Sequence, residues 1–179
     1  MVKTLSEIRD ELVDREAIRD VLLRYARGTD RCDEEMLRSA YWPDARDDHL
    51  EFSGTREEYI AYALPILRAM RHTMHMTGNI MISIDGAKAD VETYFQGYHS
   101  VEQDGARRDI FAAGRYLDNF ERRGQEWRIF KRFVIVDWFR EYPDTADWAK
   151  GPFGMKVERG QLQPEDKSYE RLKLLKQLA

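Results

Sequence analysis

The residues best suited to chemistry in this 179-residue chain are an aspartate and a histidine that lie far apart in the sequence. Asp30 ends the first long helical stretch, and His75 begins a strand-like stretch. A carboxylate that orients an imidazole lets the ring accept a proton, and a nearby phenol or guanidinium stabilises the charge that develops. Tyr25 and Arg132 supply these groups. We therefore expect a site that breaks a C–H bond without a cofactor.

Each of these residue types also has an ordinary structural role. An aspartate at a helix end commonly caps the next turn, and a strand histidine commonly bonds a backbone carbonyl. Tyr25 lies on an apolar stripe, where a core tyrosine needs one hydrogen bond. Arg132 lies between Phe130 and Val134 on one strand face, so it needs a carboxylate or a ligand to offset desolvation. Asp137 has the opposite parity and is a poor direct partner.

Two further polar residues lie in strand-like stretches. A strand turns alternate side chains toward the helices, so we expect His99 and Arg115 to line the inner face and contact a substrate, although either position also suits the outer face. His72 has the opposite parity to His75 and is expected at the surface or the rim.

The cluster Asp47, Asp48 and His49 raises the question of a metal site. Adjacent ligands on an irregular loop, without a second histidine or a cysteine pair, argue only weakly for one. Cys32 is the only cysteine, which excludes an intrachain disulfide and an ordinary cysteine-based metal cluster. We expect neither a metal nor an organic cofactor.

Length and composition indicate one domain with a real core, since 42% of the residues are hydrophobic and 12% are aromatic. Charged residues make up 35% of the chain, but the net charge of -4 argues against nucleic-acid binding. No stretch approaches a membrane span, and the first ten residues lack a signal-peptide core. We expect a soluble, cytoplasmic protein with no membrane partner.

Helical spacing dominates the first part of the chain. Apolar residues recur at helical intervals over residues 5–27, with Gly28 as the expected stop, so this stretch is one long helix or a kinked pair. Asp33 is expected to cap a short helix that Pro43 ends. Residues 44–49 then follow as an irregular acidic segment.

A third helix and four strands complete the pattern. Thr55 and Glu58 have the capping-box spacing, and Pro65 predicts a kink or an early break in the helix that follows. After residue 71 the period changes to that of strands, with a hairpin signal at Asp85-Gly86. The return strands are expected over residues 89–101, 108–122 and 126–140.

Helices followed by strands indicate an α+β fold, with the helices on one face of an antiparallel sheet. Long hairpin-connected strands twist, and a strongly curved sheet around helices leaves a cavity at its open end, where we expect the site. We expect one domain over residues 1–142. A polar tail at 143–179, with a short helix at 165–178, should pack on the same domain or on a neighbouring subunit.

The chain resembles the SnoaL-like branch of the nuclear transport factor 2-like superfamily over residues 5–140. The resemblance rests on the Tyr25–Asp30 spacing, on "HTMHMTGN" around His75 and on "GRYLDNFERRGQEWRIFKRFVIVDW". That branch includes scytalone dehydratase, hexachlorocyclohexane dehydrochlorinase and bile-acid 7α-dehydratase. The resemblance implies a cone-shaped, cystatin-like α+β barrel with one deep apolar pocket, in a homo-oligomer that is a trimer or a dimer.

The resemblance also implies roles for the residues. Asp30 would orient His75, which would be the base of a lyase without metal or organic cofactor. Tyr25 would bond the substrate, and Arg132 would face the leaving group or an oxyanion. The segment "YWPDARDDHLEFSG" is similar to a subgroup found beside aromatic-compound catabolism, some of whose members release formaldehyde from diaryl propane diols. That similarity would place Asp47, Asp48 and His49 near the pocket mouth. We expect substrate contacts from Tyr41, Asp48 and His49.

These features favour a lyase for a small aromatic or cyclic substrate, and leave open dehydration or retro-aldol cleavage. One alternative is a ketosteroid-type isomerase, in which Asp30 alone shuttles a proton. Another is a non-catalytic ligand-binding or interaction module, because one fold serves many functions.

Overall fold

The computed structural model describes residues 3–178, with side chains through residue 175. Residues 1 and 2 of the expected domain and residue 179 of the expected tail lie outside it. The tail helix expected over 165–178 consists of two short helices. The elements are α1 (Leu5–Arg31), α2 (Glu34–Ser39), β1 (Tyr41–His49), β2 (Phe52–Thr55), α3 (Arg56–Ala69), β3 (His72–Asp85), β4 (Lys88–Gln103), β5 (Ala106–Arg123), β6 (Glu126–Pro143), η1 (Pro152–Gly154), α4 (Ser168–Arg171) and η2 (Lys173–Leu178).

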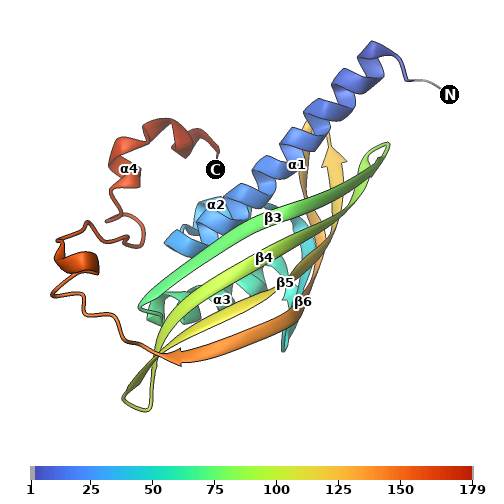
Figure 1. Cartoon of the computed structure of the whole chain (residues 1–179). Helices are drawn as coiled ribbons and strands as arrows, with labels where there is room; N and C mark the ends of the chain where they lie inside the picture. The colour runs from blue at the N-terminus through green and yellow to red at the C-terminus, as the bar shows by residue number, and fades with distance from the viewer. Residues whose placement is uncertain (1–2, 179) are drawn as a thin grey trace.

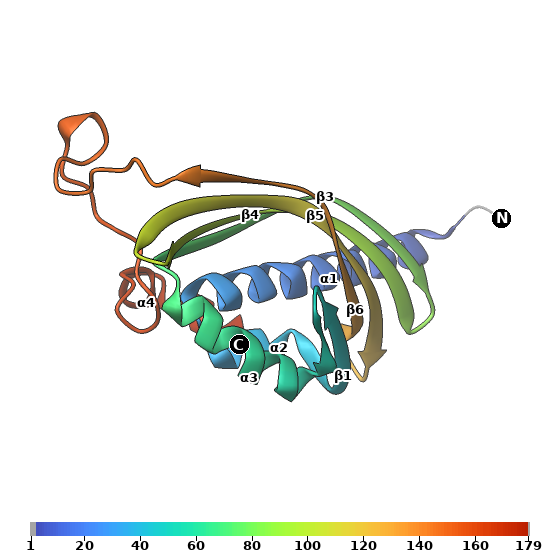
Figure 2. The same cartoon turned by 90° about the horizontal axis from the view of Figure 1, so that it is seen from below.

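The strands form one curved sheet that arches over the helices (Figures 1 and 2). Their order is β2-β1-β6-β5-β4-β3, and all neighbours are antiparallel except β1 and β6. The α+β class with helices on one face is therefore confirmed. The sheet remains open, with β2 and β3 as its edges, rather than closing as a barrel. We call the face that α1 and α3 cover the concave face and the opposite one the convex face.

Helix α1 runs without interruption to the site. Thr4 and Glu7 form a capping box at its start, and Cys32 ends it in the left-handed conformation. Gly28, expected to stop the helix, lies inside it. The position suits glycine because a Cβ there would come within 2.6 Å of the backbone nitrogen of Leu37 in α2. Asp30 consequently lies within the last turn of α1.

The acidic segment at 44–49, expected to be irregular, is the second half of β1. Asp47 is buried there, whereas its neighbours Arg46 and Asp48 are not. The segment pairs in parallel with β6, which places Asp47 beside Arg132. Its inward position carries a carboxylate instead of an apolar side chain, so the hydrophobic alternation that marks a strand is absent from the sequence.

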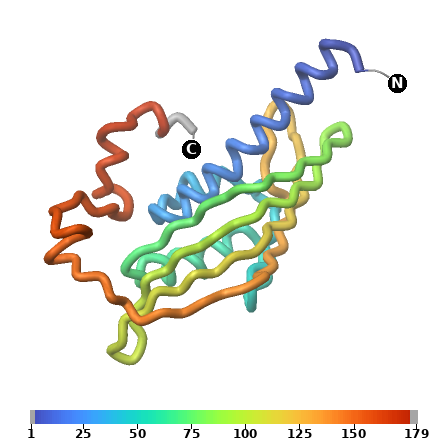
Figure 3. The backbone as a smooth tube through the Cα atoms, viewed as in Figure 1, coloured from blue at the N-terminus to red at the C-terminus, as the bar shows by residue number. Residues whose placement is uncertain are grey.

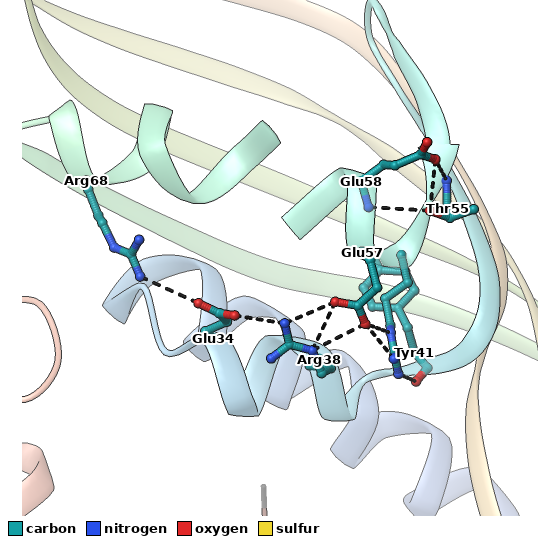
Figure 4. Close-up of polar contacts among 8 residues, drawn as sticks. Glu34, Arg38, Tyr41, Thr55, Glu57, Glu58 and Arg68 are labelled. Atoms are coloured by element: carbon teal, nitrogen blue, oxygen red, sulfur yellow. Dashed lines mark hydrogen bonds and ion pairs between the residues drawn. The ribbon is translucent and has the colours of Figure 1, made fainter. Parts of the chain in front are cut away.

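Short-range polar contacts hold the two shorter helices. Asp33 caps α2, and Thr55 with Glu58 forms the predicted capping box of α3 (Figure 4). The helix continues past Pro65, since its apolar face packs in the core and offsets the lost hydrogen bond. Arg38 of α2 forms an ion pair with Glu57 of α3 at 3.1 Å (Figure 4).

The tail folds back onto the domain and reaches the C-terminal end of α1 (Figure 3). Arg31 donates to the carbonyl of Gln161 at 2.8 Å, and its own carbonyl accepts from the amide of Gln163 at 2.8 Å. The Tyr169 hydroxyl donates to Asp33 at 2.8 Å. The tail therefore braces the helix end that carries Asp30.

The substitution Gly28→Ala tests this packing against intrinsic helix preference. Preference alone favours alanine by about 1 kcal/mol, but contact with the Leu37 backbone predicts a lower free energy of unfolding, by about 1–3 kcal/mol. Urea denaturation measures the sign. The control is Gly78→Ala, where a Cβ meets no atom within 4 Å, and a stabilised Gly28→Ala protein would contradict the proposed packing.

Candidate active site

Asp30 and His75 meet where the last turn of α1 crosses the start of β3. Asp30 Oδ1 lies 2.7 Å from His75 Nδ1, and Asp30 Oδ2 accepts the backbone amide of His75 at 2.8 Å. The two side chains are 10% and 9% exposed, respectively. One carboxylate thus binds both the ring and the main chain of the same histidine, which fixes the orientation of the ring.

This contact assigns different tasks to the two residues. An ionised carboxylate only accepts hydrogen bonds, so it keeps the proton of a neutral imidazole on Nδ1 and leaves Nε2 as an acceptor. Both oxygens of Asp30 are occupied by His75. The geometry therefore suits His75 for proton transfer and Asp30 for orientation.

His99 lies beside this pair on the concave face. Its ring centre is 5.1 Å from that of His75, and its Nδ1 is 3.0 Å from the Thr73 hydroxyl. Burial lowers the pKa of His99 to about 4, and the nearby His75 acts in the same direction, so His99 is neutral near pH 7.

Gly97 pairs with His75 across β3 and β4. A Cβ there would lie 3.1 Å from His99 Nε2 and 3.6 Å from His75 Nε2. The two Nε2 atoms therefore converge on one spot beside Gly97.

Arg132 lies deeper, in the core, with a fully buried side chain. Its Nε and Nη2 each donate to the Asp118 carboxylate at 2.7 Å, and its guanidinium carbon lies 3.9 and 4.1 Å from the ring centres of Tyr25 and Tyr116. Asp118 faces Arg132 directly from β5. Nε and Nη2 thus face a protein carboxylate and not a leaving group, whereas the buried Nη1 has no hydrogen-bond partner among the described residues.

Tyrosines surround this ion pair. The hydroxyls of Tyr25 and Tyr59 are 2.8 Å apart, and the Tyr41 hydroxyl donates to Asp47 at 2.5 Å. Burial is the main cause that raises the pKa of these three phenols, which keeps them protonated. Tyr25 and Tyr41 are thus buried members of a polar core network, and Tyr25 has Tyr59 as its hydroxyl partner.

Two expected substrate contacts lie elsewhere. Arg115 forms an ion pair with Asp137 at 3.0 Å on the convex face, because its neighbour Tyr116 points inward. The Asp48 carboxylate accepts from the Ser53 hydroxyl at 2.5 Å and has the opposite parity to buried Asp47. The sequence-based positions of Arg115 and Asp48 are therefore corrected.

His49, by contrast, has the parity of the concave face. Its ring stacks on that of Tyr59 in α3, with ring centres 5.2 Å apart and an angle of 23° between the planes. Its Nδ1 lies 3.4 Å from Asp47 Oδ1.

Sequence reasoning missed the part that Tyr59 and Asp118 play, since only strand register and helix packing reveal their partners.

A cleft of about 320 Å³ opens between the tail and the start of β3 and reaches Asp30. Its wall includes Trp148 and Arg159 from the tail. His72 lies here at the rim, as expected, with its Nε2 2.7 Å from an Arg159 nitrogen. The tail therefore shapes the approach to the candidate site.

Across residues 3–178, no group of three or more histidine, cysteine, aspartate or glutamate side chains is arranged to hold a metal ion. In the same part of the chain, no helix combines the length and the apolar character that crossing a membrane requires.

Known structures share this architecture. A type 2 hexachlorocyclohexane dehydrochlorinase (LinA) has a TM-score of 0.71 at 22% identity, covering 82% of this chain and 98% of that one. A scytalone dehydratase-like protein from Novosphingobium aromaticivorans has a TM-score of 0.67 at 20% identity, covering 87% and 96%. A nuclear transport factor 2-like protein with a cystatin-like fold from the same species has a TM-score of 0.61 at 21% identity, covering 76% and 92%. These similarities show the fold.

No curated protein matches the chain. The family model of the SnoaL-like domain, however, matches residues 10–132, which is more than half of the sequence. The match spans Asp30, His75 and the strands that hold Arg132. The chain belongs to the SnoaL-like domain family of the nuclear transport factor 2-like superfamily.

Proposed function

We propose that the protein is a lyase that acts on a small aromatic or cyclic substrate and uses no metal or organic cofactor. The observation that carries this proposal is the double contact of Asp30 with His75, which leaves His75 Nε2 as the proton acceptor beside Gly97. In an elimination the base removes a proton from carbon while a neighbouring bond to oxygen or halogen breaks, and in retro-aldol cleavage it removes a hydroxyl proton while a C–C bond breaks. Structural neighbours named as a dehydrochlorinase and as scytalone dehydratase-like support this class of reaction.

His99 has a distinct role in this proposal. If the Thr73 hydroxyl donates to His99 Nδ1, the neutral ring carries its proton on Nε2, which borders the same spot as His75 Nε2. A neutral donor stabilises an enolate or phenolate oxygen without competing for the substrate proton. Tyr25 and Arg132 support the site from the core and do not contact the substrate.

The occupied carboxylate distinguishes this proposal from its enzymatic rival. A ketosteroid-type isomerase needs a carboxylate that shuttles the proton itself. Both Asp30 oxygens accept hydrogen bonds from His75, so neither is available for that task unless the pair opens. The leaving group is water, halide or, after retro-aldol cleavage, formaldehyde.

Asp30→Asn and His75→Gln are each expected to lower kcat/KM by about 10²–10⁴, because each removes the same proton-transfer unit. The double variant is expected to lose no more than the worse single variant. A panel of aromatic diols and of hydroxylated and halogenated rings, monitored for water, halide or formaldehyde release, supplies the rates. The control Met74→Gln changes the neighbouring outward side chain. A silent His75→Gln beside an inactive Asp30→Asn would instead indicate that the Asp30 carboxylate moves the proton itself, as in the ketosteroid-type mechanism.

The lowered pKa of His99 predicts a pH effect on stability. The unfolded chain binds this proton near the ordinary value of 6.5 and the folded chain only near 4, so stability falls as the pH drops through that window. The loss approaches about 3 kcal/mol at the acid end. Urea denaturation of wild type and His99→Asn at about pH 7 and about pH 4.5 measures it. An unchanged pH slope in the variant would argue against a buried neutral His99.

We also propose that a second copy of the chain covers the convex face and makes a homo-oligomer. Large apolar side chains are exposed there, and a groove of about 480 Å³ includes Met76 and Trp138. Trp138→Glu is expected to shift the protein toward the monomer in light scattering. Phe153→Glu in the tail, where the side chain is 95% exposed, is the control. A monomeric wild-type protein would refute the proposal.

A further inference from the structure

A second carboxylate–imidazole pair lies on the concave face and has no part in the function proposed above. Asp47 is fully buried, and its Oδ2 accepts the Tyr41 hydroxyl at 2.5 Å. Its Oδ1 lies 3.4 Å from His49 Nδ1. Among the described residues neither of these two atoms has a hydrogen-bond partner, although both are buried. A small rotation of the His49 ring would join them.

The charges around Asp47 favour such a bond. Asp47 pairs with Arg132 across β1 and β6, but Arg132 directs its Nε and Nη2 at Asp118. The third guanidinium nitrogen, Nη1, is buried and has no hydrogen-bond partner among the described residues. Buried charge without a full complement of partners is costly. A proton held on His49 Nδ1 would supply a donor to Asp47 Oδ1.

The surroundings of His49 expose one edge of its ring. The ring lies flat against Tyr59, and the side chain is 23% exposed, whereas Asp47 is 0% exposed. Nδ1 is on the edge that faces Asp47, so the opposite edge, with Nε2, is the accessible one. A buried acid that holds an accessible imidazole repeats the arrangement of Asp30 and His75.

Direct contacts connect the two pairs. His49 stacks on Tyr59, and the Tyr59 hydroxyl lies 2.8 Å from that of Tyr25, which is in the same helix as Asp30. The charge of His49 also contributes to the lowered pKa of His99, whose ring centre is 5.1 Å from that of His75. A ligand that touches both His75 and His49 must extend across several strands, which suits a ring-containing molecule better than a short-chain acid.

We infer that His49, positioned by Asp47, donates the proton to the departing oxygen in the reaction whose proton acceptor is His75. This inference rests on the proposed lyase function and names its substrate class as cyclic or aromatic alcohols that lose water. The C–H proton moves to His75 Nε2, and the C–H electrons form the new C=C bond. His49 enters this step as the imidazolium, with a proton on each ring nitrogen. The C–O electrons leave with oxygen, which takes the Nε2 proton and departs as water, and neutral His49 keeps its Nδ1 proton toward Asp47. Exchange with solvent then returns both rings to their starting states.

A leaving-group comparison tests the inference. The β-hydroxy and β-chloro derivatives of indanone yield the same indenone, but chloride departs without a proton whereas hydroxide requires one. His49→Phe keeps a flat ring against Tyr59. It is expected to slow elimination of water by about 10²-fold and to slow elimination of chloride by a factor at least ten times smaller. Asp47→Asn should show the same selectivity, with thermal melting as the check on folding. Equal losses for both leaving groups, or none, would overturn the inference.

His75→Gln separates the two proposals, because it should stop both eliminations. If it stops neither, the lyase proposal fails, whatever the His49 variants show.

A measurement without substrate covers the case in which the wild type turns over neither probe. Nitrogen-15 NMR distinguishes a proton on Nδ1 from one on Nε2, and the His49 signals are identified by their loss in His49→Phe. At the pH of the elimination assay we expect protons on both nitrogens of His49 in the wild type and loss of the Nδ1 proton in Asp47→Asn, with His72→Gln unchanged. A wild-type His49 that carries a single proton, on either nitrogen, would overturn the inference.

Discussion

The double hydrogen bond from Asp30 to His75 is the contact on which the candidate site depends. One carboxylate binds both the backbone amide and the ring of His75. It therefore fixes the edge strand β3 to the last turn of α1, and it also sets the orientation of the ring. Gly28 lets α2 pack closely against that turn, and the tail braces it through Arg31. Helix packing far from His75 is thereby coupled to the position of a single imidazole.

The charged core is a second constraint, and it limits what the site can do. Burying the Arg132 guanidinium costs desolvation energy. Its hydrogen bonds to Asp118 and its contacts with the tyrosine rings offset that cost. The Asp118 carboxylate and the tyrosine rings thus take up most of the surroundings of this guanidinium. The imidazoles on the concave face have different surroundings: His75 is oriented by a carboxylate, and His99 is kept neutral by burial.

Several elements were predictable because their signals are local. Capping residues at Asp33 and Thr55, the Asp85-Gly86 turn and the long alternating stretches depend on neighbours in the sequence, and the structure contains each of them. The Asp30–His75 contact was also predicted, and the two side chains do meet. The strand at 44–49 was missed because a buried aspartate occupies its inward position and conceals the alternation.

By itself, the sequence determined the element types, the α+β class and the residues with the chemistry to transfer a proton, since these follow from side-chain chemistry and short-range periodicity. Only the tertiary structure decided which of them work together. Strand register gave Arg132 its partner Asp118, turned Arg115 and Asp48 away from the concave face, and set the ring of His75 beside that of His99. Register and curvature arise from contacts between residues far apart in the chain, and a single bulge changes which side chains face inward.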